Sequence, residues 1–198
     1  MTHFMKTAFA IIFLISVCLS ISPSQVSAQR DYFTLEEIEL IREAQEIDKR
    51  IEILTQVIDR RFAILKIDVG GAKIAAKDAE KWGEIPAGTR LQLLLDIKRI
   101  LQKAIDDIDS LAERPDSAIL PDPEKKDAKG YAELFPKAVR TLAAAATRYR
   151  PALKIELDKP NDNAEKGSVL DAIESCDQII AAVAKLPAEV SKKKGRTN

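Results

Sequence analysis

The sequence predicts an all-α protein: an antiparallel helical bundle of about four major helices with a long heptad-patterned first helix. Three observations predict this fold. Ala, Leu, Ile, Glu, Lys and Arg dominate after residue 28, and most of these residues favour helix. Few segments alternate apolar and polar residues as half-buried strands do. Apolar residues recur at steps of three and four in segments joined by short connections, as in helical bundles.

Residues 1–28 are predicted to be a cleaved secretory signal peptide. Lys6 precedes an apolar run, residues 7–21, of about 15 residues, whereas a membrane-spanning helix needs about 20. Val26-Ser27-Ala28 follows, with the ending that a signal peptidase accepts. An uncleaved membrane anchor is the alternative. The chain is therefore expected to be exported, periplasmic or secreted, with one helical-bundle domain over 29–190 and a basic disordered tail over 191–198.

The first helix is expected from Thr34 to Lys66. Thr34 and Glu37 have the spacing of a capping box. A continuous helix of this length would extend about 50 Å. Its apolar stripe follows a heptad whose only interruption is Arg61, a pattern typical of coiled coils. The stripe consists of Leu40, Ala44, Ile47, Ile51, Leu54, Ile58 and Leu65.

A short helix over 72–81 and a turn-rich connector are expected next. Trp82 is the only tryptophan, and we expect it to cover one end of the core, since large aromatic side chains mostly serve burial. An exposed anchor for a sugar or a partner is the alternative. The second helix is expected to begin at Thr89, with capping-box spacing to Gln92, and to end near Arg114 before a proline.

The third helix is expected to begin at Pro136, where the missing N–H costs little, and to end near Leu157. Residues 128–135 are expected to form a separate turn of helix. The alanine run 143–146 permits close approach of a neighbouring helix, and Pro151 is expected to kink this one.

The fourth helix is expected to be capped by Asp162, with Glu165 at the matching position, and to end at Pro187. Cys176 lies on its apolar stripe. We expect Cys176 to be a small buried hydrophobe. An intermolecular disulfide or a redox thiol is the alternative, and it would need an exposed sulfur.

The side-chain inventory argues against most catalytic chemistry. Removal of residues 1–28 takes away His3, which is the only histidine, both methionines and one of the two cysteines. No histidine-based triad or zinc site can then form, and no phosphate-binding glycine motif occurs. Lys6 is the only charged residue removed, so 30 basic and 31 acidic side chains remain. This balance gives no general attraction to nucleic acid. We therefore expect no catalytic, metal-binding or cofactor-binding residues and no cofactor.

One acidic cluster could be interpreted as a site for a hard cation, namely Asp106, Asp107 and Asp109. Neighbouring residues on a helix point about 100° apart, so these carboxylates are expected to form a solvated face instead.

The leading functional prediction is an exported, non-enzymatic protein that acts in the cell envelope through protein–protein contact or self-association of its helix faces. No stable membrane anchor is expected after cleavage. A carrier or sensor of a small apolar ligand between helices is one alternative, with the alanine run and Pro151 leaving the pocket. A carboxylate-dependent cell-wall hydrolase is another. It requires two carboxyl groups about 5–10 Å apart, and Tyr32, Tyr131 and Trp82 could stack on its sugars.

Overall fold

Helices are the only regular secondary structure in the part of the chain that the structure, a computed structural model, describes. This confirms the all-α prediction. The described residues are 31–71, 74–115, 130–159 and 162–186. The predicted signal peptide and basic tail lie outside them. Residues from Tyr32 onward belong to one compact unit. Its elements are α2 (Leu35–Glu43), α3 (Ile47–Ile64), η1 (Ala76–Trp82), α4 (Arg90–Glu113), α5 (Tyr131–Leu157), α6 (Asn163–Ala182) and η3 (Val183–Lys185).

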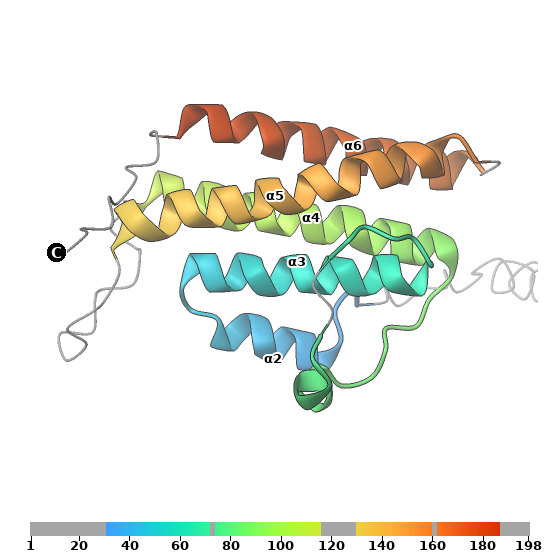
Figure 1. Ribbon diagram of the computed structural model, residues 1–198, viewed down its shortest axis with the longest axis horizontal. Helices are drawn as coiled ribbons and strands as arrows, with labels where there is room; N and C mark the ends of the chain where they lie inside the picture. The colour runs from blue at the N-terminus through green and yellow to red at the C-terminus, as the bar shows by residue number, and fades with distance from the viewer. Residues whose placement is uncertain (1–30, 72–73, 116–129, 160–161, 187–198) are drawn as a thin grey trace, which may run out of the picture. The chain divides into compact units, whose positions relative to one another are not determined.

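The four long helices form an antiparallel bundle. α3, α4, α5 and α6 run alternately in opposite directions along a common axis (Figure 1). Each packs against two neighbours, in the cyclic order α3, α4, α6, α5, while α4 and α5 make a weaker contact across the bundle. The predicted bundle of about four major helices is therefore confirmed.

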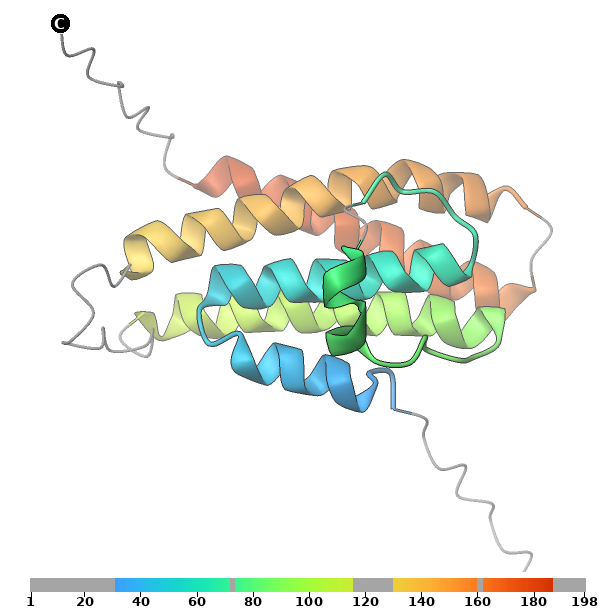
Figure 2. The ribbon, with the colours of Figure 1, turned by 60° about the horizontal axis from the view of Figure 1, so that its bottom comes forward.

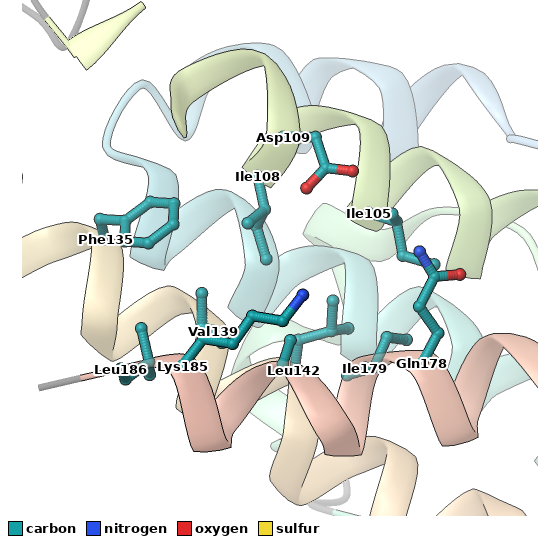
Figure 3. Close-up of a pocket in the computed structure, with 11 residues that line it drawn as sticks. Ile105, Ile108, Asp109, Phe135, Val139, Leu142, Gln178, Ile179, Lys185 and Leu186 are labelled. Carbon is teal, nitrogen blue, oxygen red and sulfur yellow. The ribbon is translucent and has the colours of Figure 1, made fainter. Parts of the chain in front are cut away.

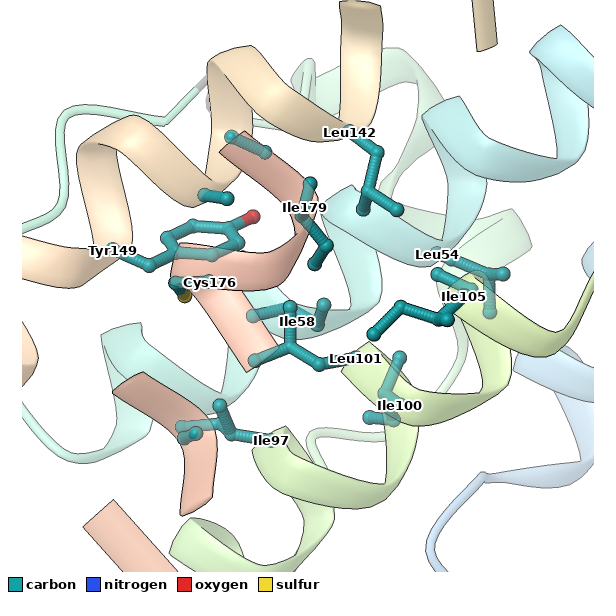
Figure 4. Close-up of a cluster of buried hydrophobic side chains, with 14 of the residues drawn as sticks. Leu54, Ile58, Ile97, Ile100, Leu101, Ile105, Leu142, Tyr149, Cys176 and Ile179 are labelled. Carbon is teal, nitrogen blue, oxygen red and sulfur yellow. The ribbon is translucent and has the colours of Figure 1, made fainter. Parts of the chain in front are cut away.

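The bundle encloses a single apolar core (Figure 4). Each buried Leu or Ile side chain contributes about 1.5–3 kcal/mol relative to an exposed one. The hydroxyl of Tyr149, on α5, donates a hydrogen bond to the carbonyl of Thr55 on α3 at 3.0 Å, so this buried polar group is satisfied. The fully buried residues from the four helices include Leu54, Ile58, Ile97, Leu101, Leu142, Leu153, Val169 and Cys176.

The predicted continuous helix from Thr34 to Lys66 is wrong. The capping box is present, since the backbone N–H of Thr34 donates to Glu37 at 3.0 Å and that of Glu37 donates to Thr34 Oγ1 at 3.2 Å. However, the chain leaves the helix at Ala44, where ψ is 77°, and starts again at Ile47. The result is a short helix, α2, folded back beside α3 (Figure 1).

A buried ionic cluster explains this break. Arg61, the interruption in the heptad, is fully buried, and its Nη2 donates to Glu37 Oε2 at 2.6 Å. Arg60 Nη1 donates to Glu37 Oε1 at 2.6 Å, and Arg61 Nε lies 4.0 Å from Asp96 Oδ2 on α4. Along a straight helix, 24 residues would separate Glu37 from Arg61 by about 36 Å. Pairing the buried guanidinium therefore requires the chain to turn back.

Trp82 is buried, with 5% of its surface exposed, which confirms its predicted role in the core. η1, which ends at Trp82, packs against α2 at the side of the bundle and not at one of its ends (Figure 2). The guanidinium of Arg60 lies 5.3 Å from the ring centroid of Trp82, within range of a cation–π interaction. Gly83 follows with a φ of 58°, and a Cβ there would lie 2.4 Å from the side chain of Glu36. The Glu36 side chain could move away, but the positive φ, with ψ at −152°, is a backbone conformation that favours glycine.

The second and fourth predicted helices are confirmed at their starts. Thr89 Oγ1 accepts from the N–H of Gln92 at 3.2 Å, and Gln92 Oε1 accepts from the N–H of Thr89 at 2.8 Å. Asp162 Oδ1 accepts from the N–H of Glu165 at 2.8 Å. These caps depend on residues three positions apart, so a local pattern suffices to predict them.

The predicted start of the third helix at Pro136 is wrong. α5 begins at Tyr131 and continues as one helix through both prolines to Leu157. Side-chain packing holds the turn before Pro136. Leu134 is buried in the core, and the rings of Tyr131 and Phe135, one helical turn apart, stack with centroids 5.0 Å apart. This packing offsets the backbone hydrogen bond that Pro136 cannot donate.

Glu37→Gln should lower the free energy of unfolding by about 3–5 kcal/mol, because it removes the carboxylate that neutralises two buried or nearly buried guanidinium groups. Chemical denaturation measures this change. Glu39→Gln is the matched control in the same helix. Its salt bridge to Arg42 is exposed, so the expected loss is below about 0.5 kcal/mol. Equal effects of the two substitutions would contradict the role assigned to Glu37.

Candidate functional site

Cys176 is fully buried, as predicted for a small hydrophobe in the core. Burial, helped by the nearby Asp177, raises the pKa of its thiol to about 12. The thiolate is the nucleophilic form of cysteine, and at neutral pH this side chain remains protonated. Cys176 therefore contributes to packing and offers no reactive thiol at the surface of the bundle.

The carboxylates of the acidic cluster diverge, as helical spacing predicts. Asp107 accepts a hydrogen bond from Lys103 at 2.5 Å, and Asp106 accepts one from Gln102 at 2.8 Å. Asp109 is exposed. Among the residues that the structure describes, no group of three or more acidic, His or Cys side chains could hold a metal ion.

A pocket with a volume of about 210 Å³ opens between three helices of the bundle (Figure 3). We call it the α4–α5–α6 pocket. Its floor is formed by buried apolar side chains, and its rim carries three exposed polar ones, Asp109, Gln178 and Lys185. Phe135, Ala182 and Leu186 complete it, and its floor residues are Ile105, Ile108, Val139, Leu142 and Ile179.

The antiparallel arrangement places this pocket at one end of the three helices. The C-terminal half of α4, the N-terminal half of α5 and the C-terminal end of α6 meet there (Figure 3). Each helix directs an apolar stripe toward the others, as amphipathic helices in a bundle do. The site therefore consists of core-facing residues that do not fill the space between them.

The same three helices are joined by salt bridges at their opposite end. Arg90, at the start of α4, donates to Glu156 on α5 at 2.5 Å and lies 3.3 Å from a carboxylate oxygen of Glu165 on α6. Lys159 also donates to Glu156, at 2.5 Å. Glu156 is 2% exposed, so its carboxylate is a nearly buried junction between the helices. One end is thereby held together by charge, and the other contains the pocket.

The electrostatics of this junction favour the charged state of both partners. Burial raises the pKa of Glu156, but the hydrogen bonds from Lys159 and Arg90 more than offset it, so the pKa lies below its ordinary value of 4.5. The hydrogen bond to Glu156 raises the pKa of Arg90. Glu156 is therefore ionised, and stabilises the fold, at every pH above this range.

The sequence predicts that the residues of the pocket floor are apolar and face the core, but it does not predict the position of the pocket. Ile105 and Ile108, and likewise Val139 and Leu142, are three residues apart, which is the spacing of an apolar helix stripe. The alanine run 143–146 and Pro151, which were expected to leave the pocket, do not line it. Ala143, Ala145 and Ala146 are buried in close contact instead. The heptad repeat alone carries no signal for Lys185 or Leu186, because they lie beyond the regular helix.

The aromatic residues considered for sugar stacking do not gather at one site. Tyr32 packs on Phe33 with ring centroids 4.4 Å apart, and Tyr131 stacks on Phe135. Trp82 is buried under Arg60. Their interactions are with side chains of the fold, and none of the three lines the α4–α5–α6 pocket.

In the described ranges, no helix is both long and apolar enough to cross a membrane. The fold and the pocket define a class of protein: an all-α bundle with an open, largely apolar pocket between three of its helices. The chain matches none of the protein-family models, curated proteins or solved structures with which it was compared.

Glu156→Gln should lower the free energy of unfolding at pH 7 by about 1–2 kcal/mol, because it removes hydrogen bonds to a charged group. The pKa of Glu156 is lower in the folded state, so its stabilising contribution is present at neutral pH. This contribution disappears as the pH falls below about 4.5 and the carboxylate is protonated. The difference between variant and wild type should therefore shrink on acidification.

Urea denaturation at pH 7 and at about pH 3 measures this difference. Glu174→Gln is the control, because Glu174 is exposed on α6, and it should change stability little at either pH. A Glu156→Gln effect that is equal at both pH values would show that its charge does not hold this end together.

Proposed function

We propose that this protein binds a small ligand with an apolar body and holds it in the α4–α5–α6 pocket, as a carrier or sensor. The observation that carries the proposal is the pocket of about 210 Å³ with an apolar floor and a polar rim. An apolar cavity of about 150 Å³ is large enough to take up benzene. Ligand sites typically combine such apolar walls with a few polar groups that orient the ligand.

Two features support ligand binding over intermolecular contact as the main role. Helix stripes that could bind a partner are used inside the bundle, since Ile51, Leu54 and Ile58 are all completely buried. In contrast, the pocket is an apolar surface that no described side chain fills. Contact with a protein partner stays a prediction. Leu35 and Ile85, which are 78% and 75% exposed, are the apolar side chains that such a partner could cover.

A binding role also agrees better with the pocket than hydrolysis does. Glycoside hydrolysis by two carboxyl groups requires them to face each other across the substrate at about 5–10 Å. Among the described residues that line the pocket, Asp109 is the only carboxylate. We therefore propose a non-enzymatic protein, without a resident cofactor.

Ala182→Phe should weaken ligand binding strongly, because the introduced phenyl ring would occupy the pocket that Ala182 lines. 2-Phenylethanol is a suitable neutral probe, and calorimetric titration should give a dissociation constant between about 10 μM and 1 mM for a ligand this small. The variant should bind it at least tenfold more weakly and be as stable as the wild type, since it fills space without removing a contact.

Ala181→Phe is the matched control. Ala181 is the preceding residue of α6, is exposed and does not line the pocket, so binding should be unchanged. No detectable binding of 2-phenylethanol to the wild type, or equal loss in both variants, would count against the pocket as the binding site.

We further propose that the protein acts after export, in a periplasm or outside the cell, as the apolar segment and cleavage pattern of residues 1–28 indicate. The expected product of cleavage is a chain that begins at Gln29. Intact-mass measurement of the protein recovered from its native host tests this. A chain that retains residues 1–28 would overturn the proposed export route.

A further inference from the structure

The rim of the α4–α5–α6 pocket carries both signs of charge. Asp109 projects from α4 and Lys185 from η3, and Gln178 contributes an amide from α6. Figure 3 shows the ammonium group of Lys185 and the carboxylate of Asp109 both directed over the apolar floor. Within the described part of the chain, neither side chain forms a salt bridge. Both are therefore available to a ligand that sits between them.

The volume of the pocket limits the apolar body of that ligand. Scaling from the roughly 150 Å³ that accommodates benzene, a pocket of 210 Å³ holds about eight carbon atoms. A benzyl group or a branched aliphatic side chain fits this limit, whereas a long acyl chain does not. Phe135 offers one aromatic ring in the wall against which a second ring could pack.

The charge of the rim limits the polar head. A head with a single negative charge would be attracted to Lys185 and repelled by Asp109. A head with a single positive charge would be attracted to Asp109 and repelled by Lys185. Like charges placed close together cost binding energy and exclude the wrong ligands. A head that carries an ammonium and a carboxylate group on one carbon can pair with both side chains and meets no such repulsion.

We propose that the ligand is a free hydrophobic α-amino acid, bound as its zwitterion. This inference rests on the proposed function of the pocket. The apolar side chain of the ligand lies on Ile108, Val139 and Leu142, and its charged head lies at the rim. Lys185 pairs with the ligand carboxylate and Asp109 with the ligand ammonium group. The end of a peptide carries only one of these charges, so it fits the rim less well.

Four probes with the same phenyl body test the head-group preference by calorimetric titration at low ionic strength, where surface charges are least screened. They are L-phenylalanine, 2-phenylethylamine, 3-phenylpropionate and 2-phenylethanol. An exposed ion pair typically strengthens binding up to about fivefold. L-Phenylalanine should therefore bind about fivefold more tightly than each singly charged probe, and at least as much more tightly than 2-phenylethanol, which forms no ion pair.

The outcomes separate the two proposals. Binding of 2-phenylethanol as tightly as L-phenylalanine would leave the apolar pocket intact as a site and overturn the amino-acid ligand. Tighter binding of either singly charged probe would do the same. Failure of all four probes to bind would overturn the proposed function of the pocket and this inference with it.

Two rim variants test which residue meets which charge. Lys185→Gln should weaken the binding of L-phenylalanine about fivefold, to the affinity of 2-phenylethylamine. It should leave the binding of 2-phenylethanol unchanged. Asp109→Asn should lower the affinity for L-phenylalanine by a similar factor, to that of 3-phenylpropionate. Lys166→Gln is the control, because Lys166 is exposed near the other end of α6 and does not line the pocket. Insensitivity of L-phenylalanine binding to both rim variants would overturn the inference.

Discussion

A guanidinium group buried on the inner face of α3 requires a carboxylate beside it, and this requirement shapes the N-terminal part of the fold. Arg61 has no exposed surface, and Glu37 supplies its charge partner from α2. Asp96 on α4 lies on the other side of the same guanidinium, with Oδ2 4.0 Å from Arg61 Nε, and Arg60 also pairs with Glu37. An unpaired charge at this depth would cost several kcal/mol, more than the few hydrogen bonds lost by interrupting a helix. The chain therefore turns back at Ala44.

Charge and apolar packing are divided between the two ends of α4, α5 and α6. At one end, Glu156 joins Arg90 and Lys159, and its lowered pKa keeps this junction ionised at neutral pH. At the other end, apolar side chains from the same helices face each other without filling the space. Side chains in cores are otherwise packed as densely as organic crystals. This unfilled volume is therefore the basis of the proposed ligand site.

The proposed site needs no reactive group. Its floor supplies apolar contact, and its rim supplies one positive charge, one negative charge and an amide. Such a site can select a ligand by size and charge, which is the task of a carrier or a sensor.

The sequence by itself determined the helical class, the caps at Thr34, Thr89 and Asp162, and most of the apolar floor of the pocket. These features depend on residues three or four positions apart, which a local pattern contains. Only the tertiary structure decided the break at Ala44 and the start of α5 at Tyr131. The tertiary structure alone also decided how the ends of α4, α5 and α6 meet around the α4–α5–α6 pocket. These features arise from contacts between residues that are distant in the sequence, such as Glu37 and Arg61. Such contacts contribute more free energy than the local preference of the chain for helix.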